Sequence, residues 1–337
     1  MLKNTLYARS ISLRASRLLR TGVSGRVLAS FERVCDLVTD SGDVIALVWG
    51  GIGDGPLNVV LSHGPGDDLP AGTQFTVTGE DDVVRSEPVI ADPISPATGS
   101  QIKIRAPHPG VEALAGPVAC GKRPAEASTP RNYLAISPIV IDLTSAIPWN
   151  PQPDWDHLRE RRRQIAAGAR IIAGILAAAG WAPARCGLPE VVCEQAARGQ
   201  AAAVRALVGL GPGLTPAGDD WLAGWLLAQH LGGEDLRGFR PTEGWHDLEG
   251  LIVALAADRT TTLSRALLTC AATGEADAAW HALLASLAEV PMTNLPIYQS
   301  TQTILSHGAT SGAAMLTGFC AGLAHLTPDA CSLIPDP

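Results

Sequence analysis

A glycine-rich loop that leads directly into two adjacent carboxylates is the segment of this chain whose residue types best suit chemistry. Residues 209–220 read Gly-Leu-Gly-Pro-Gly-Leu-Thr-Pro-Ala-Gly-Asp-Asp. Alternating glycines allow sharp turns and leave backbone N–H groups open, which is how helix N-termini bind phosphate and carboxylate groups. The loop therefore predicts a site for a small anionic ligand. Its candidate substrate-binding residues are Gly209, Gly211, Gly213, Thr215 and Gly218.

The candidate catalytic groups are Asp219 and Asp220, because a carboxylate can accept a hydrogen bond from an amide or relay a proton. Both fall in the first turn of a helix predicted to begin at Thr215, a good N-cap, with Pro216 at the first helical position. Acids there complement the positive end of the helix dipole. Gly218 inside the helix costs about 1 kcal/mol relative to alanine, so a ligand or another helix must come close to it. The alternative is a capped turn between helices whose aspartates only favour the dipole.

Two common phosphate-binding motifs do not fit this loop. A Walker loop would need a lysine after the last glycine, whereas Gly213 is followed by Leu214 and Thr215. A dinucleotide-binding loop would need a third glycine at position 214 and a strand before it, but residues 201–208 are alanine-rich and helical in pattern. Both nucleotide interpretations are therefore rejected.

A second helix start later in the chain echoes the first. Residues 218–224 and 312–318 share the frame Gly-x-x-apolar-Leu-x-Gly, and each is preceded by a threonine. If the two are a true duplication, two helix N-termini face one site, and Ser311 and Gly312 join the candidate substrate-binding residues. The match is short enough to arise by chance in a Gly- and Leu-rich chain, so both interpretations stay open.

A threonine-rich segment supplies further candidate ligands. Arg259 precedes Thr-Thr-Thr-Leu-Ser over residues 260–264, and Thr261 and Ser264 are candidate substrate-binding hydroxyls. The alternative is a solvated helix face whose hydroxyls bond to the preceding turn. His307, beside the second glycine motif, is a candidate general base.

No cofactor is predicted, although Mg²⁺ is possible. One of the two adjacent aspartates could hold that ion, but the sequence supplies no complete set of ligands.

The period of the hydrophobic pattern predicts an α+β fold. Between about residues 20 and 147 the chain is rich in Val, Ile, Thr and Gly, with strand-like runs at 43–49, 57–61, 74–78, 102–105 and 139–143. They predict an antiparallel β-rich, barrel-like domain. Prolines mark a linker at 148–153, and from 154 to 326 a 3.6-residue period predicts an α-helical bundle that carries the glycine loop. Helices are expected at about 154–179, 188–208, 216–231, 245–273, 276–289, 297–306 and 310–325.

Composition narrows the class of partner. The chain has 337 residues, of which 46% are hydrophobic, and its net charge is −8. Such an acidic balance disfavours nucleic acid, and no apolar run is long enough to span a bilayer. Seven cysteines without a Cys-x-x-Cys pair predict free thiols in the cytoplasm. A small anionic metabolite is the expected ligand.

The sequence over 209–224 resembles the signature of a bacterial family whose best-known member is a subunit of the oxamate carbamoyltransferase of allantoin breakdown. The resemblance extends to Phe-Glu-Arg-Val from Phe31, to Thr-Thr-Leu-Ser over 261–264 and to Thr-Ser-Gly over 310–312, and so covers roughly residues 20–325. The family often has an aspartate after the second Ser-Gly, where this chain has Ala313 and Ala314.

The resemblance implies transfer of a carbamoyl group between oxalurate and phosphate, which gives oxamate and carbamoyl phosphate, in a complex with other protein subunits. The Ser-Thr-Arg-Thr phosphate motif of the ordinary transcarbamoylases is missing, since Ser128-Thr-Pro-Arg131 departs from it at the third position. The alternatives are a non-catalytic structural or regulatory subunit that binds a metabolite, and a free-standing hydrolase of a small amide. Whether the chain is itself an enzyme stays open at this point.

Overall fold

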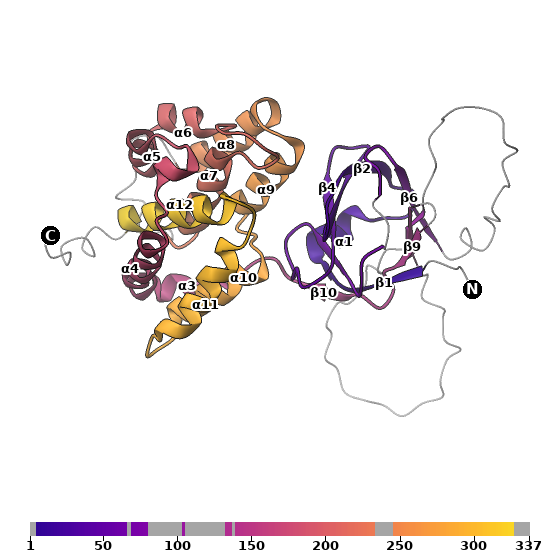
Figure 1. Cartoon of the computed structure of the whole chain (residues 1–337), viewed down its shortest axis with the longest axis horizontal. Coiled ribbons are helices and arrows are strands. Elements are labelled where there is room, and N and C mark those ends of the chain that lie inside the picture. Colours follow the sequence, from indigo (N-terminus) through magenta and orange to yellow (C-terminus); the bar gives the residue numbers. More distant parts are fainter. Residues whose placement is uncertain are drawn as a thin grey trace, which may run out of the picture. The chain divides into compact units, whose positions relative to one another are not determined.

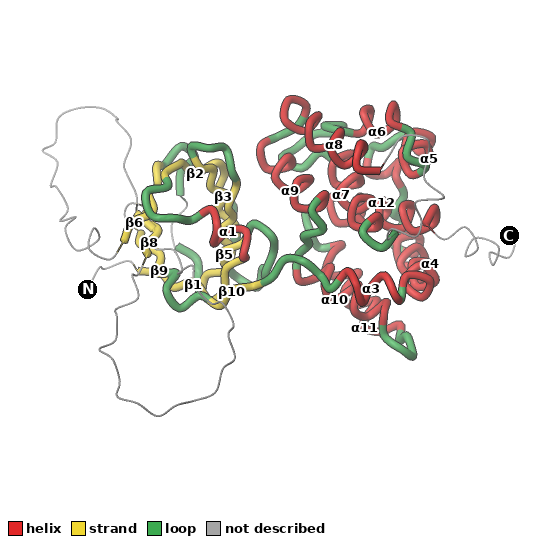
Figure 2. The backbone as a smooth tube through the Cα atoms, turned by 180° about the vertical axis from the view of Figure 1, so that it is seen from behind, coloured by secondary structure: helices red, strands yellow, loops and turns green. Residues whose placement is uncertain are grey.

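The computed structural model describes residues 5–65, 69–79, 103–104, 132–136, 139–232 and 245–326. Contacts divide the chain into two compact units, Met1–Asn150 and Pro151–Pro337 (Figure 1). The first unit is built of strands and one short helix, and the second of helices (Figure 2). The predicted α+β class is therefore confirmed. Among the described residues, no helix is both long and apolar enough to cross a membrane.

The first unit is a barrel-like sheet. Its elements are β1 (Thr5–Ser12), α1 (Leu13–Leu18), β2 (Ser24–Ser30), β3 (Val34–Thr39), β4 (Val44–Val48), β5 (Asn58–Leu61), β6 (Gln74–Gly79), β7 (Lys103–Ile104), β8 (Asn132–Ile136), β9 (Ile139–Asp142) and β10 (Ile147–Trp149). The strand order is β10-β1-β5-β4-β3-β2-β6-β7-β9-β8, and β1 also pairs with β9, which closes the sheet into a ring. Alternate residues of the strands, such as Leu37, Ile45 and Val59, fill its core.

The sheet differs from the expected purely antiparallel one. β1 pairs in parallel with β9 and β10, and β4 pairs in parallel with β5. The sequence runs at 43–49 and 57–61 are predicted as strands of an antiparallel sheet, but β4 and β5 pair in parallel. β5 pairs antiparallel with β1, a strand that lies ahead of residue 20, where the sequence pattern placed the start of the domain.

The second unit is a bundle around one central helix. Its elements are α3 (Trp155–Glu160), α4 (Arg162–Ala178), the short 3₁₀ helix η1 (Pro183–Cys186), α5 (Glu190–Ala197), α6 (Ala201–Leu207), α7 (Ala217–Gln229), α8 (Trp245–Arg259), α9 (Thr262–Ala272), α10 (Ala278–Ala288), α11 (Asn294–Leu305) and α12 (Ser311–Leu326). Residues 217–228 of α7 are all buried, and Trp221 and Trp225 are fully enclosed. α7 is thus the core of the unit.

Three of the expected helices are each split in two. The backbone breaks at Arg161 between α3 and α4, at Gly199 between α5 and α6, and before Thr261 between α8 and α9. Gly199 adopts a left-handed φ of 76°, and the Thr261 hydroxyl accepts the Ser264 N–H and so caps a new helix. At Gly199 and Thr261, local backbone conformation and capping therefore outweigh the continuous hydrophobic period.

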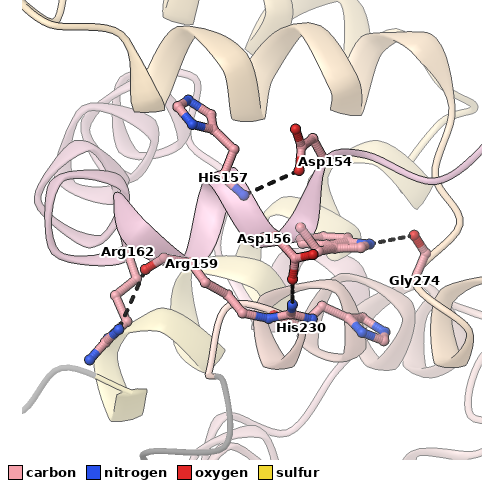
Figure 3. A network of polar contacts seen from close by, with 8 residues as sticks. Asp154, Asp156, His157, Arg159, Arg162, His230 and Gly274 are labelled. Atoms are coloured by element: carbon pink, nitrogen blue, oxygen red, sulfur yellow. Dashed lines mark hydrogen bonds and ion pairs between the residues drawn. The ribbon is translucent and has the colours of Figure 1, made fainter.

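Polar contacts fix α3 against the ends of two other helices (Figure 3). The Trp155 indole N–H donates to the Gly274 carbonyl at 2.9 Å, just after α9. The Arg159 Nε donates to the His230 carbonyl at 2.9 Å, at the end of α7, and its guanidinium also bonds Asp156. The C-terminal end of α7 is thereby held in place, at the opposite end from the glycine loop.

α7 and α12 pack in parallel along most of their lengths, and they lie side by side in both views (Figures 1 and 2). A Cβ on Gly224 would overlap the Met315 carbonyl, and a Cβ on Gly318 would overlap the Trp221 carbonyl. In the shared Gly-x-x-apolar-Leu-x-Gly frame, Trp221 corresponds to Met315 and Gly224 to Gly318. The contacts are thus reciprocal, as expected of two copies of one motif packed face to face.

Candidate functional site

The N-terminal ends of α7 and α12 meet. The Thr215 Oγ1, just before α7, lies 2.9 Å from the Ser311 Oγ at the start of α12. Each helix follows a shorter one, α6 or α11, through a turn that contains a glycine of positive φ, Gly209 or Gly308. The two candidate half-sites are therefore brought together, and their hydroxyls bond to each other.

Thr215 does not cap α7 as the sequence suggested. The helix begins at Ala217 with Pro216 at the N-cap position, and no side chain caps it. The Gly218 N–H instead donates to the Leu210 carbonyl at 2.8 Å. Because the loop turns back on itself and supplies this carbonyl, the Thr215 hydroxyl is released to face α12.

Backbone packing explains most of the glycines. A Cβ on Gly218 would overlap the Leu207 carbonyl, one on Gly312 the Ile304 carbonyl, and one on Gly209 the Arg259 carbonyl. Of the two explanations for Gly218, a neighbouring helix is therefore the one that the packing supports. Gly211 and Gly213 have left-handed φ values of 119° and 96° in an exposed part of the loop.

Asp219 is surrounded by donors from its own chain. Its Oδ1 accepts the Gly209 N–H at 2.7 Å, while its Oδ2 accepts the hydroxyls of Ser264, at 2.8 Å, and of Thr260. The side chain is 1% exposed. This carboxylate joins the glycine loop to the turn between α8 and α9.

Asp220 has the opposite surroundings. Its Oδ2 is buried and has no hydrogen-bond partner, although the residue is only 5% exposed. Burial raises the pKa of this carboxyl to about 7, and the charge of Asp219 adds to the rise, while the Ser311 and Thr215 hydroxyls lower it. A buried polar atom without a partner is uncommon, and a group that titrates near neutral pH is suited to proton transfer.

The hydroxyls of the threonine-rich segment are engaged with the protein. Thr261 donates to the Leu214 carbonyl and accepts the Ser264 N–H, and Ser264 donates to Asp219. These hydroxyls therefore do not form a solvated helix face, and they are not left free to bind a ligand. In the structure, Thr261 and Ser264 hold the loop in shape.

Two other groups lie around the helix starts. His307 precedes α12, where its carbonyl accepts the Gly312 N–H and its Nδ1 lies 3.7 Å from Asp277 Oδ2. Cys186, at the end of η1, is a residue that the sequence pattern did not single out. Burial and then the nearby Asp220 charge raise the pKa of its thiol. No local signal in the sequence connects positions 186 and 220, because only the packing brings them together.

A metal site is not assembled in the described part of the chain, where no three His, Cys, Asp or Glu side chains gather in a way that could hold an ion. A magnesium ion at Asp219 would have to displace three hydrogen-bond donors that already occupy both of its oxygens.

The comparison with protein families gives one match. The family model described as oxamate carbamoyltransferase subunit AllH matches residues 207–323. This segment contains the glycine loop, both aspartates and both helix starts. Searches of the curated proteins and of the solved structures give no significant match. In this segment of its helical unit, the chain is therefore similar to the family of the oxamate carbamoyltransferase subunit AllH.

Proposed function

We propose that the chain is a carbamoyltransferase subunit that acts on oxalurate and phosphate in one direction, and on oxamate and carbamoyl phosphate in the other. The description of the matching family supports this assignment. The matched residues 207–323 begin two residues before the glycine loop and end within α12, so they span the whole pair of helix starts. In the cell, this reaction would serve the use of allantoin nitrogen, in the cytoplasm.

The observation that carries the proposal is the buried Asp220, whose unpartnered Oδ2 lies in the first turn of α7 beside the start of α12. When phosphate attacks the carbamoyl carbon of oxalurate, a P–O–C bond forms and the C–N bond to oxamate breaks. The leaving nitrogen must then gain a proton. A carboxyl with a pKa of about 7 can donate this proton at neutral pH and take it back in the reverse direction.

The anionic part of the substrate would be bound by the loop and the paired helix starts. The positive ends of the α7 and α12 dipoles point to the same place, and both favour a negative charge there. Gly209 and Gly218 already donate their N–H groups to Asp219 and to Leu210. We therefore assign the substrate contacts to Gly211, Gly213, Thr215 and Ser311, and a supporting role to Gly209, Gly218 and Gly312.

Asp219 is assigned a supporting role as well. Because its oxygens accept three hydrogen bonds from the protein, it is occupied in shaping the loop. The same holds for Thr261 and Ser264, whose hydroxyls bond to Leu214 and Asp219. Of the two aspartates, Asp220 is thus the proposed proton donor.

The second candidate function is a non-catalytic subunit that binds a metabolite or completes a complex whose chemistry lies in other chains. It is favoured by one observation, namely that so many of the polar side chains near the loop bond to the protein itself. In both cases the chain is expected to assemble with other protein subunits, as the family description supports.

Calorimetric titration tests ligand binding at this site. The purified chain is titrated with oxamate, oxalurate, carbamoyl phosphate and phosphate, and the titration is repeated on Asp220→Asn and Thr215→Val. Asp156→Asn, an exposed acid of α3, is the control. We expect saturable binding that is weakened in the first two variants and unchanged in the control. Equal binding by all four proteins would show that the ligand binds elsewhere.

A further inference from the structure

Two adjacent carboxyl groups in the first turn of α7 have different hydrogen-bond surroundings. Three donors surround Asp219, from Gly209, Thr260 and Ser264, and such donors favour the charged form of a carboxylate. One of these donors is a backbone N–H, which stays in place whatever the side chains do. Both oxygens of Asp219 are therefore hydrogen-bonded within the protein, although the residue is only 1% exposed.

Asp220 lacks such donors on one of its oxygens. Its Oδ2 has no partner, and burial without a partner penalises a negative charge. The ionised Asp219 beside it adds like-charge repulsion. The hydroxyls of Ser311 and Thr215 act against these two effects, but burial outweighs them.

We propose that the two carboxyls divide their roles: Asp219 is a positioning residue that keeps the negative charge of the pair, and Asp220 keeps the proton and presents it from Oδ2. The proton of Asp220 then serves an acceptor such as the leaving nitrogen, and the resulting carboxylate accepts an N–H of the amide product. A neutral carbamoyl group fits this pair, whereas an oxyanion placed against it would be repelled by Asp219. The use of the proton in catalysis rests on the proposed function, but the division of charge does not.

The groups that act on Asp220 come from α7, from the loop before it and from α12: Asp219, Thr215 and Ser311. Cys186, at the end of η1, lies near enough for the charge of Asp220 to act on its thiol. Burial raises the pKa of the Cys186 thiol, so this group stays neutral at pH 7. Asp219 therefore supplies the neighbouring charge, and replacing it has a defined effect on the proton of Asp220.

Infrared spectroscopy detects this proton directly, because a protonated carboxyl and a carboxylate absorb at different frequencies. The full-length chain is titrated from about pH 5 to pH 9, and the spectrum of Asp220→Asn is subtracted to isolate the band of Asp220. We expect a protonated-carboxyl band that disappears around neutral pH. In Asp219→Asn the midpoint should fall to a lower pH, because the neighbouring charge is gone.

Ser311→Ala keeps the test decisive if Asp219→Asn does not fold. It removes a hydroxyl that favours the charged form of Asp220, so the midpoint should move up rather than down. Asp156→Asn should leave it unchanged, since its side chain is 95% exposed on α3.

Absence of the band from the unmodified chain at pH 6 would overturn the division of roles, as would a midpoint that stays fixed in both Asp219→Asn and Ser311→Ala. The band requires no substrate and no partner subunit. A band that behaves as expected in a protein whose Asp220→Asn variant still transfers carbamoyl groups would therefore refute the proposed function alone.

Discussion

At the scale of single residues, Asp219 and Asp220 show how neighbours in a sequence acquire different chemistry. Asp219 accepts three hydrogen bonds, whereas Oδ2 of Asp220 accepts none. The sequence predicted two candidate catalytic carboxylates at these positions. It did not predict how their hydrogen bonding differs, because two of the donors to Asp219, Thr260 and Ser264, lie more than forty residues away in the chain.

Stability should depend on pH through Asp220. The pKa of its carboxyl is about 7 in the folded chain and near the ordinary value of 3.8 when the chain unfolds. The folded state thus binds the proton more tightly, and its contribution to stability is full below about pH 4 and is lost as the pH rises through 7. Urea unfolding of the wild-type chain and Asp220→Asn at several pH values measures this. The stability of Asp220→Asn relative to wild type should increase between about pH 5 and 8; a constant difference would contradict the prediction.

Removing a hydrogen-bond donor to Asp219 should lower the stability of the folded chain. Ser264→Ala deletes a hydroxyl that bonds the buried carboxylate at 2.8 Å, so the free energy of unfolding should drop by about 1.5–3 kcal/mol. Ser286→Ala is the matched control, because its exposed hydroxyl bonds only the Ala282 carbonyl one turn earlier in α10. Urea unfolding of the two variants should separate them clearly, and equal losses would argue against the assigned role of Asp219.

At the scale of helices, the parallel pair of α7 and α12 positions the site. The sequence predicted both helices and noted their shared glycine frame, which left a duplication and a coincidence equally open. The reciprocal contacts of Gly224 and Gly318 with the opposite helix favour duplication. They could not be predicted, because a seven-residue frame does not say which helices pack together. The capping of α7 was also predicted wrongly, because the Gly218 N–H donates to the Leu210 carbonyl and the Thr215 side chain does not cap the helix.

The closeness of these helices predicts the effect of adding a methyl group. A Cβ at position 318 would overlap the Trp221 carbonyl, so Gly318→Ala should force α7 and α12 apart and destabilise the chain by about 1–3 kcal/mol. Gly174→Ala in α4 has no heavy atom nearby and should instead stabilise by up to about 1 kcal/mol. Thermal unfolding followed by circular dichroism compares the two changes. A destabilised Gly174→Ala or an unaffected Gly318→Ala would contradict the packing.

At the scale of the whole molecule, the chain consists of two units with separate cores. The apolar core of the second unit extends from Trp155 to Leu323, and among the described residues it contains none of the first unit. Composition and hydrophobic period predicted the change from strands to helices near residue 150. They did not predict that the barrel would be closed by β1 and β9, since this pairing joins the two ends of the first unit.

Separate cores imply that the second unit folds without the first. A fragment of residues 151–337 should show the helical circular dichroism of its elements and unfold cooperatively in urea, because the core around α7 is complete within it. The measurement needs only far-ultraviolet circular dichroism with increasing urea. A fragment that is largely unfolded in buffer would mean that the barrel supplies stability to the helical unit.

The most direct test of the central claim is the rate of carbamoyl transfer by the assembled complex with Asp220→Asn in place of the wild-type chain. Asp156→Asn serves as the charge-matched control, and thermal unfolding verifies that both variants fold. If Asp220 transfers the proton, kcat for the phosphate-dependent cleavage of oxalurate should fall by about 100-fold or more, while the control keeps the wild-type rate. A folded Asp220→Asn complex that turns over at the wild-type rate would show that the chemistry lies elsewhere.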